Sequence, residues 1–288
     1  MKYVFVKKHQ KSWSIGLQCR ILQVSRPGYY VWLKQAVSQR QQANQILDAK
    51  IVSIFKHHKS RYGSPRITDE LKEQGEKVNH KRIEKRMKIL EIRAKQAKKF
   101  KYTTDSKHDK PIAKNLLDQD FSATAPNQKW VGDITYVWTQ SGWLYLAVIL
   151  DLYSRQVIGW SMSPRIHKKL VCDALMMALW RRHFPKGVIV HTDRGSQYCS
   201  TRYQQLLTDN QLLCSMSGRG NCYDNAVAES FFHSLKVECL HDEHFIDRPS
   251  AQKEIFEYIE IYYNQQRKHS SIGYKTPSQV EALFSLAS

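Results

Sequence analysis

Long apolar runs are absent from this 288-residue sequence, and so is a cleavable leader. No stretch reaches the roughly eighteen consecutive apolar residues that a membrane-spanning helix requires, so no membrane segment is expected. The N-terminal stretch is basic, but its apolar part is too short and too interrupted for a signal peptide. The default expectation is a cytoplasmic protein.

Cysteines in metal-binding spacing are also missing. The six cysteines form no C-x-x-C pair and no short Cys/His array. Their spacing therefore indicates neither a zinc site nor a disulfide framework.

Acidic residues are few: 26 Asp and Glu stand against 45 Lys and Arg, which gives a net charge of +19. The imbalance lies in residues 1–125, with 28 basic and 11 acidic residues (net +17), whereas residues 126–288 hold 17 and 15 (net +2). So dense a basic footprint favours nucleic-acid binding over a merely soluble basic surface. The front half is the expected polyanion-binding part.

Helical patterns fill that front half. Residues 11–37 predict helix, turn and helix, and residues 38–58 predict another helix. Ser64 followed by proline begins the next one, and Asn79 can cap a further helix. We therefore predict a helical helix-turn-helix region over residues 1–93.

The helix after Asn79 has an apolar face and a strongly basic one. The basic face carries Lys81, Arg82, Lys85, Arg86 and Lys88. A short helix, a tight turn and a basic second helix match the helix-turn-helix pattern, whose second helix enters the major groove of DNA. Groove insertion and non-specific phosphate contact are equally consistent with the pattern, and a solvated basic face is the plain structural alternative.

A basic linker is predicted over residues 94–125, and strand patterns begin after it. The predicted strands are 130–138, 143–151, 156–162, 188–193 and 212–216, with helices over 167–184, 201–210, 224–240 and 249–266. This order predicts an α/β domain over residues 126–288, a mixed five-stranded sheet with flanking helices.

Three carboxylates stand out in this domain. Asp133 lies inside a predicted strand, Asp193 follows the end of another, and Glu229 lies on a predicted helix with Lys236 on the same face. Each acid alone is more often a cap or a solvated side chain. Together they form an oxygen-rich ligand set of the kind that hard divalent cations prefer.

Five other positions have competing interpretations. In the loop over residues 217–225, Arg219 is the expected phosphate contact. Asp151 follows an apolar strand, where a turn is favoured over a metal ligand. His233 is interpreted as a partly buried helix histidine rather than a DNA contact, and Tyr258 and its neighbour Tyr262 as packing residues.

The acids stand in recognisable motifs. The runs WVGDITY, HTDRGSQY and GRGNCYDNAVAESFFHSLKVE, with 35 residues between Asp193 and Glu229, resemble the DDE core of retroviral integrases and bacterial transposases. The resemblance is strongest to the second-reading-frame product of the insertion sequence three family. CRILQVSRPGYYVWL, YGSPRI and YYNQQRKHSSIGYKTPSQV extend it over nearly the whole chain.

The resemblance implies a ribonuclease H-like fold and magnesium, with manganese as a substitute, at Asp133, Asp193 and Glu229. It implies that Lys236 contacts donor-end DNA. The implied activity is metal-dependent DNA strand cleavage and strand transfer at element ends. The implied partners are double-stranded DNA, further copies of the chain and the upstream-frame product, on the bacterial nucleoid.

Two other functions stay open at this point. A DNA-binding regulator without productive catalysis is the main alternative, since the sequence shows no sustained heptad and no zinc-binding head and is expected to be the downstream product alone. A nuclease for RNA–DNA hybrids is a weaker third option.

Overall fold

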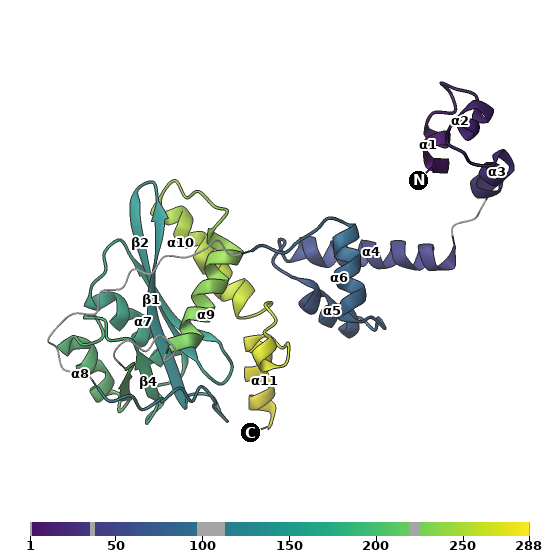
Figure 1. Cartoon of the computed structure of the whole chain (residues 1–288). Coiled ribbons are helices and arrows are strands. Elements are labelled where there is room, and N and C mark those ends of the chain that lie inside the picture. The colour runs from purple at the N-terminus through teal and green to yellow at the C-terminus, as the bar shows by residue number, and fades with distance from the viewer. Residues whose placement is uncertain (1, 35–37, 97–112, 219–224, 288) are drawn as a thin grey trace.

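The computed structural model describes residues 2–34, 38–96, 113–218 and 225–287 (Figure 1). Its first three helices are α1 (Lys2–Lys8), α2 (Ile15–Ile21) and α3 (Arg26–Lys34). Val6, Cys19 and Tyr29 form a small core that belongs to these helices alone. The Ser25 hydroxyl accepts from Gly28 N at 3.0 Å and so caps the start of α3.

A second helical group follows, made of α4 (Gln39–His57), α5 (Ser64–Glu73) and α6 (His80–Ile89). The side chain of Asn79 caps α6 by accepting from Arg82 N at 2.8 Å, as predicted. Ile83 and Met87 are buried on the apolar face of α6. Gly75 takes a φ of +85° just after α5, a backbone conformation that favours glycine at a helix end.

Five strands form one mixed sheet in the order β3-β2-β1-β4-β5. They are β1 (Lys129–Thr139), β2 (Gly142–Asp151), β3 (Val157–Ser163), β4 (Ile189–Thr192) and β5 (Leu213–Met216). The first three are antiparallel, and β4 pairs in parallel with both β1 and β5. The predicted five-stranded mixed sheet is confirmed.

The short strand β4 leaves part of β1 without a strand neighbour. The β1–β4 pairing runs only from Lys129 to Gly132, which pairs with Thr192. In the described residues, β1 from Asp133 onward therefore has its ladder partner, β2, on one side only.

Helices cover both faces of the sheet (Figure 1). On one face, α7 (Lys168–Arg181) and α8 (Thr201–Asp209) share a core with alternate β1 and β2 residues. A Cβ on Gly159 of β3 would lie 2.2 Å from the Ala174 carbonyl oxygen, so only glycine allows α7 to pack this closely. The other face packs against α9 (Ala226–Leu235) and α10 (Arg248–Phe256).

Both of these last helices continue into π-helical turns. η2 (Lys236–Leu240) follows α9, and η3 (Glu257–Tyr263) follows α10. The short 3₁₀ turn η4 (Ser270–Ile272) and α11 (Pro277–Ala287) complete the chain. The predicted helices over 224–240 and 249–266 thus exist, but each changes its hydrogen-bond pattern part-way.

The second helical group is not separate from the sheet half. One hydrophobic cluster contains Leu47, Ile67 and Ile83 from α4–α6 together with sheet and α9–α10 side chains. The predicted linker lies outside the described residues over 97–112, and its end joins the core, where Leu117 is buried and Leu116 N donates to Ser215 Oγ at 2.8 Å. In the described part of the chain, no helix is long and apolar enough to cross a membrane.

Candidate active site

Asp133 lies on β1 directly beyond the last residue that pairs with β4. Its Oδ1 accepts from the Ile134 main-chain N–H at 2.7 Å. Burial raises the pKa of this carboxyl well above its ordinary value, and the negative charges of Asp193 and Glu229 raise it further. The three predicted acids therefore lie within electrostatic reach of one another.

Asp193 is the first residue after β4, at the edge where that strand ends. Its Oδ1 accepts from Gly195 N at 2.8 Å. A Cβ on Gly195 would lie 2.9 Å from the same oxygen, so the glycine keeps space beside the carboxylate. The side chain is partly buried at the mouth of the site.

Glu229 lies in the first turn of α9, with its side chain exposed. Partial loss of water around it raises the pKa of its carboxyl. Asn225 Nδ2 donates to the Gly132 carbonyl oxygen at 3.3 Å. That bond fastens the start of α9 to the strand that carries Asp133.

Lys236 begins the π-turn two helical turns after Glu229 and is partly buried. Its Nζ lies 5.7 Å from the centroid of the Tyr136 ring. Burial lowers the pKa of this ammonium, and the nearby Asp133 charge opposes that change. The lysine therefore lies near Asp133 and Tyr136.

Tyr136 was missed from the sequence. Strand alternation places it on the opposite side of β1 from Asp133, which made it look irrelevant to the acids. Because β4 ends at Thr192, this part of β1 has a described strand, β2, on one side only, and Lys236 lies near both residues. A short fourth strand after a long first strand is the signal that could have found it.

The acids suit a hard cation chemically, because they are carboxylates and the charges of Asp193 and Glu229 raise the pKa of Asp133. A divalent ion would relieve that repulsion. Among the residues that the structure describes, no three His, Cys, Asp or Glu side chains are close enough to form a ready-made metal cage.

Two other polar residues of the sheet have structural roles. Asp151 is buried and accepts from the main-chain N–H groups of Asn127 and Tyr153, each at 2.8 Å, which agrees with the turn interpretation. The buried His191 contacts Ser215 Oγ at 2.8 Å through Nδ1. Neither residue is a ligand candidate in this arrangement.

The predictions for three helix residues had different outcomes. Tyr258 and Tyr262 are buried, as the packing interpretation requires. The prediction that His233 is partly buried was wrong: its side chain is exposed, because the buried stripe of α9 passes through Phe231, Phe232 and Leu235 instead.

The basic face of α6 divides into two kinds of residue. Arg82 Nη2 donates to Asn44 at 3.2 Å, and Arg86 Nε donates to Asp48 at 2.7 Å, so both arginines hold α6 against α4. Lys81 and Lys85 are exposed. Arg219 lies outside the described residues.

Comparison with known proteins now adds to this geometry. Two integrase core domain models match residues 123–222 and 210–277, and an HTH-like domain model matches residues 41–100. Transposase InsF for insertion sequence IS3A of Escherichia coli strain K12 is 53% identical over 98% of both chains. This chain belongs to the IS3 family of transposases.

Other relatives extend the comparison. A 31 kDa protein of insertion element IS600 from Shigella sonnei is 45% identical over 90% of this transposase and 96% of its own length. The HTLV-2 integrase catalytic core domain, solved with magnesium, is 20% identical with a TM-score of 0.41 over 55% of this chain and 98% of its own. A chain of the simian T-cell lymphotropic virus intasome is 18% identical, with a TM-score of 0.44, over 81% of this chain and 73% of its own length.

Family membership decides between the functions that the sequence left open. The transposase has the expected ribonuclease H-like integrase core, and a helical HTH-like domain precedes it in the sequence. Its relatives match it almost end to end and are named transposases. A DNA polynucleotidyl transferase is therefore the function, and the regulator alternative is not favoured.

Proposed function

We propose that Asp133, Asp193 and Glu229 hold the catalytic divalent cation, magnesium or its substitute manganese, that this transposase uses to cut and join DNA. The supporting observation is the raised pKa of Asp133, to which the charges of both other acids contribute. The positive charge of Lys236 lowers the pKa of Asp133, but burial and the two other acids outweigh it. When bound, the cation would activate the attacking oxygen and stabilise the leaving one.

The same site serves both chemical steps. In the first, water attacks a phosphodiester at the element end, the bond to the 3′ oxygen breaks, and a 3′-hydroxyl is released. In the second, that hydroxyl attacks a target phosphodiester, and the displaced target oxygen leaves with a proton. Lys236 binds the phosphate of the element end beside Asp133, since its ammonium already lies next to the acids.

The front half supplies DNA affinity. Lys81 and Lys85 of α6 contact DNA directly because both are exposed. Arg82 and Arg86 contribute to the same basic face but are also tied to α4. Arg219, in the loop before α9, is proposed as a further phosphate contact.

Joining two DNA ends requires more than one active site, so the working form is proposed to be a homo-oligomer on DNA. The upstream-frame product is proposed as a second partner that completes end recognition. These assignments concern assembly and do not alter the roles of the three acids.

A strand-transfer assay tests the proposal. The full chain is incubated with duplex DNA that carries the element's own terminal sequence and a labelled target, with and without magnesium, and with and without the upstream product. The expected result is magnesium-dependent joining that Glu229→Gln reduces on the order of 10³-fold, since several kcal/mol of transition-state stabilisation are lost. Full joining by Glu229→Gln would refute the assignment.

A further inference from the structure

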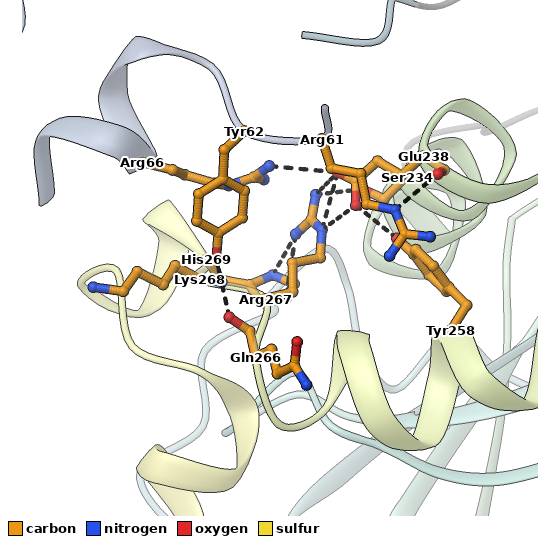
Figure 2. Close-up of polar contacts among 10 residues, drawn as sticks. All are labelled: Arg61, Tyr62, Arg66, Ser234, Glu238, Tyr258, Gln266, Arg267, Lys268 and His269. Atoms are coloured by element: carbon orange, nitrogen blue, oxygen red, sulfur yellow. Dashed lines mark hydrogen bonds and ion pairs between the residues drawn. The ribbon is translucent and has the colours of Figure 1, made fainter. Parts of the chain in front are cut away.

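A buried polar cluster joins the second helical group to the helix of Glu229 (Figure 2). Its centre is Glu238, a 6% exposed carboxylate on the π-turn η2. Glu238 lies nine residues after Glu229 and two after Lys236 on one continuous helical segment. Any shift of Glu238 is therefore transmitted along the helix to both site residues.

On the catalytic side, Arg267 holds the carboxylate. Arg267 Nε lies 2.9 Å from Glu238 Oε2, and Nη2 lies 2.8 Å from Oε1. The same Nη2 donates to Ser234 Oγ of α9 at 2.9 Å, and the Tyr258 hydroxyl donates to Glu238 Oε2 at 2.9 Å. These groups come from α9, η2, η3 and the segment after η3, so the two π-turns meet here.

On the front side, the segment between α4 and α5 contributes two residues. Arg61 Nε donates to the main-chain oxygen of Glu238 at 3.0 Å, and its guanidinium lies 4.2 Å from the centroid of the Tyr262 ring. The fully buried Tyr62 donates from its hydroxyl to the Gln266 carbonyl oxygen at 2.9 Å and accepts from Lys268 N at 3.0 Å.

Helix α5 completes the contact. Arg66 Nη1 lies 3.4 Å from Glu238 Oε1. The buried Lys268 donates to Asp69 at 2.6 Å and pairs with Glu73 at 2.5 Å. Figure 2 shows the arginines of both halves pointing toward Glu238.

We propose that Arg61, Tyr62, Arg66, Glu238 and Arg267 form an interdomain clasp that makes the position of Glu229 and Lys236 depend on the docking of α4–α6. The inference rests on the proposed function. Arg61 and Arg66 act as positioning residues for the strand-transfer reaction, through the π-turn and not by touching DNA or metal.

The π-turn makes such control physically reasonable. A π-helical segment has weaker main-chain geometry than an α-helix, recurs at functional sites and depends on outside partners. Here Arg61 supplies one of those partners at a main-chain carbonyl. A buried ion pair adds little net stability compared with apolar packing, so a network of this kind is better explained by fixing one geometry.

Arg61→Ala tests the clasp, because it removes a contact of the front half and leaves the Glu238–Arg267 pair intact. Single-turnover joining of pre-cut element-end duplex is measured in the full chain as a function of DNA concentration. We expect the maximal rate to fall about 10–100-fold, as small misplacements of reacting groups do, while Kd for the duplex changes less than about twofold. Arg61→Lys, which keeps a donor and a cation, should restore part of the rate.

Two controls make the outcome decisive. Lys72→Ala removes an exposed basic charge from α5 and should leave the maximal rate unchanged. Hydrogen exchange should be faster for the η2 amides of Arg61→Ala, with β1 and β2 unaffected. The clasp would be overturned if Arg61→Ala weakened the Kd for the duplex and left the maximal rate of joining unchanged. Equal maximal rates for Arg61→Ala and Lys72→Ala would also overturn it.

The proposed function is refuted by different results from those that refute the clasp. If the wild-type chain does not join DNA with magnesium, or Glu229→Gln joins as well as wild type, the site assignment is wrong whatever Arg61→Ala does. Should Arg61→Ala be poorly folded, Arg66→Gln is the second variant. It removes the 3.4 Å contact with Glu238 and the guanidinium that lies 5.4 Å from the centroid of the Tyr62 ring, and the same rate, Kd and exchange measurements apply.

Discussion

Asp133 carries a cost that a purely structural residue would not. A half-buried carboxylate beside two other acids is disfavoured in its ionised form, and this is what raises its pKa. Active sites commonly keep such groups at the expense of stability.

Replacing that acid should separate stability from activity. Because the folded-state pKa of Asp133 is raised, its ionised form destabilises the fold as pH rises above the ordinary value of 3.8. At pH 7 without divalent metal, Asp133→Asn is expected to raise Tm, while joining falls on the order of 10³-fold. Thermal unfolding and the joining assay check both.

Asp118→Asn is the matched control, because Asp118 is an exposed acid. Neither Tm nor the rate of joining should change in this variant. A lower Tm for Asp133→Asn would contradict the charge-repulsion account of this strand.

Lys236 offers a second test of a single side chain. Its position beside Tyr136 and Asp133 predicts that Lys236→Ala weakens binding to the element end, lowers the salt dependence of that binding by about one counterion, and slows joining. Titration of end duplex at several salt concentrations measures the first two effects. Lys253→Ala, an exposed lysine on α10, should show neither.

Among the elements, α6 is the most instructive. Its arginines bond to α4, whereas the Lys85 side chain is exposed, so part of the basic face serves packing and part is exposed to solvent. A count of basic residues on a helix overestimates the number available to DNA.

The two kinds of α6 residue should respond differently to mutation. Lys85→Ala is expected to weaken DNA binding with Tm unchanged, because a solvated cation is lost. Arg86→Ala is expected to lower stability by about 1–3 kcal/mol, because it leaves Asp48 without its charge-assisted bonds. Thermal unfolding beside a DNA titration distinguishes them. Equal Tm values for the two variants would show that the Arg86–Asp48 pair does not hold α6.

For the whole molecule, Glu238 predicts how the fold responds to acid. Burial raises the pKa of this carboxyl, but Arg267 with its hydrogen bonds, and Arg66, outweigh burial and leave it below its ordinary value of 4.5. A depressed folded-state pKa stabilises above that value, and the contribution is lost as pH falls through the folded pKa.

Glu238→Gln should therefore be less stable than wild type at pH 7, by about 3 kcal/mol or more, since Arg267 is left buried without its anion. The difference should shrink progressively below pH 4.5. Tm measured across pH for both proteins is the test, with the exposed Glu243→Gln as the control. A difference that is independent of pH would mean that packing, not charge, is responsible.

The sequence predicted what is local and periodic. Strand alternation, helix caps such as Asn79 and the acids at strand ends were visible, because each depends on neighbours a few residues away. The π-turn at Lys236 was not, since an α and a π turn share almost the same residue pattern. Nor was the Arg61–Glu238 contact, which joins residues 177 positions apart.

The same distinction applies to the predicted domains. A boundary after residue 93 follows the loss of helical periodicity in the basic stretch 94–125, but the packing of α4–α6 into the cluster that also holds Tyr258 is a long-range property. Charge and periodicity do not report which surfaces are covered.

The shared core beneath α4–α6 also governs how such a protein can be retargeted. The helices α1–α3 have a core of their own, so this unit can be exchanged between relatives as a cassette. The group α4–α6 cannot, because Arg61 and Tyr62, in the segment between α4 and α5, contact Glu238 and Gln266 of the catalytic half. Any recognition carried by α6 is inherited together with the chemistry, and a new end sequence has to be acquired by substitution within that helix.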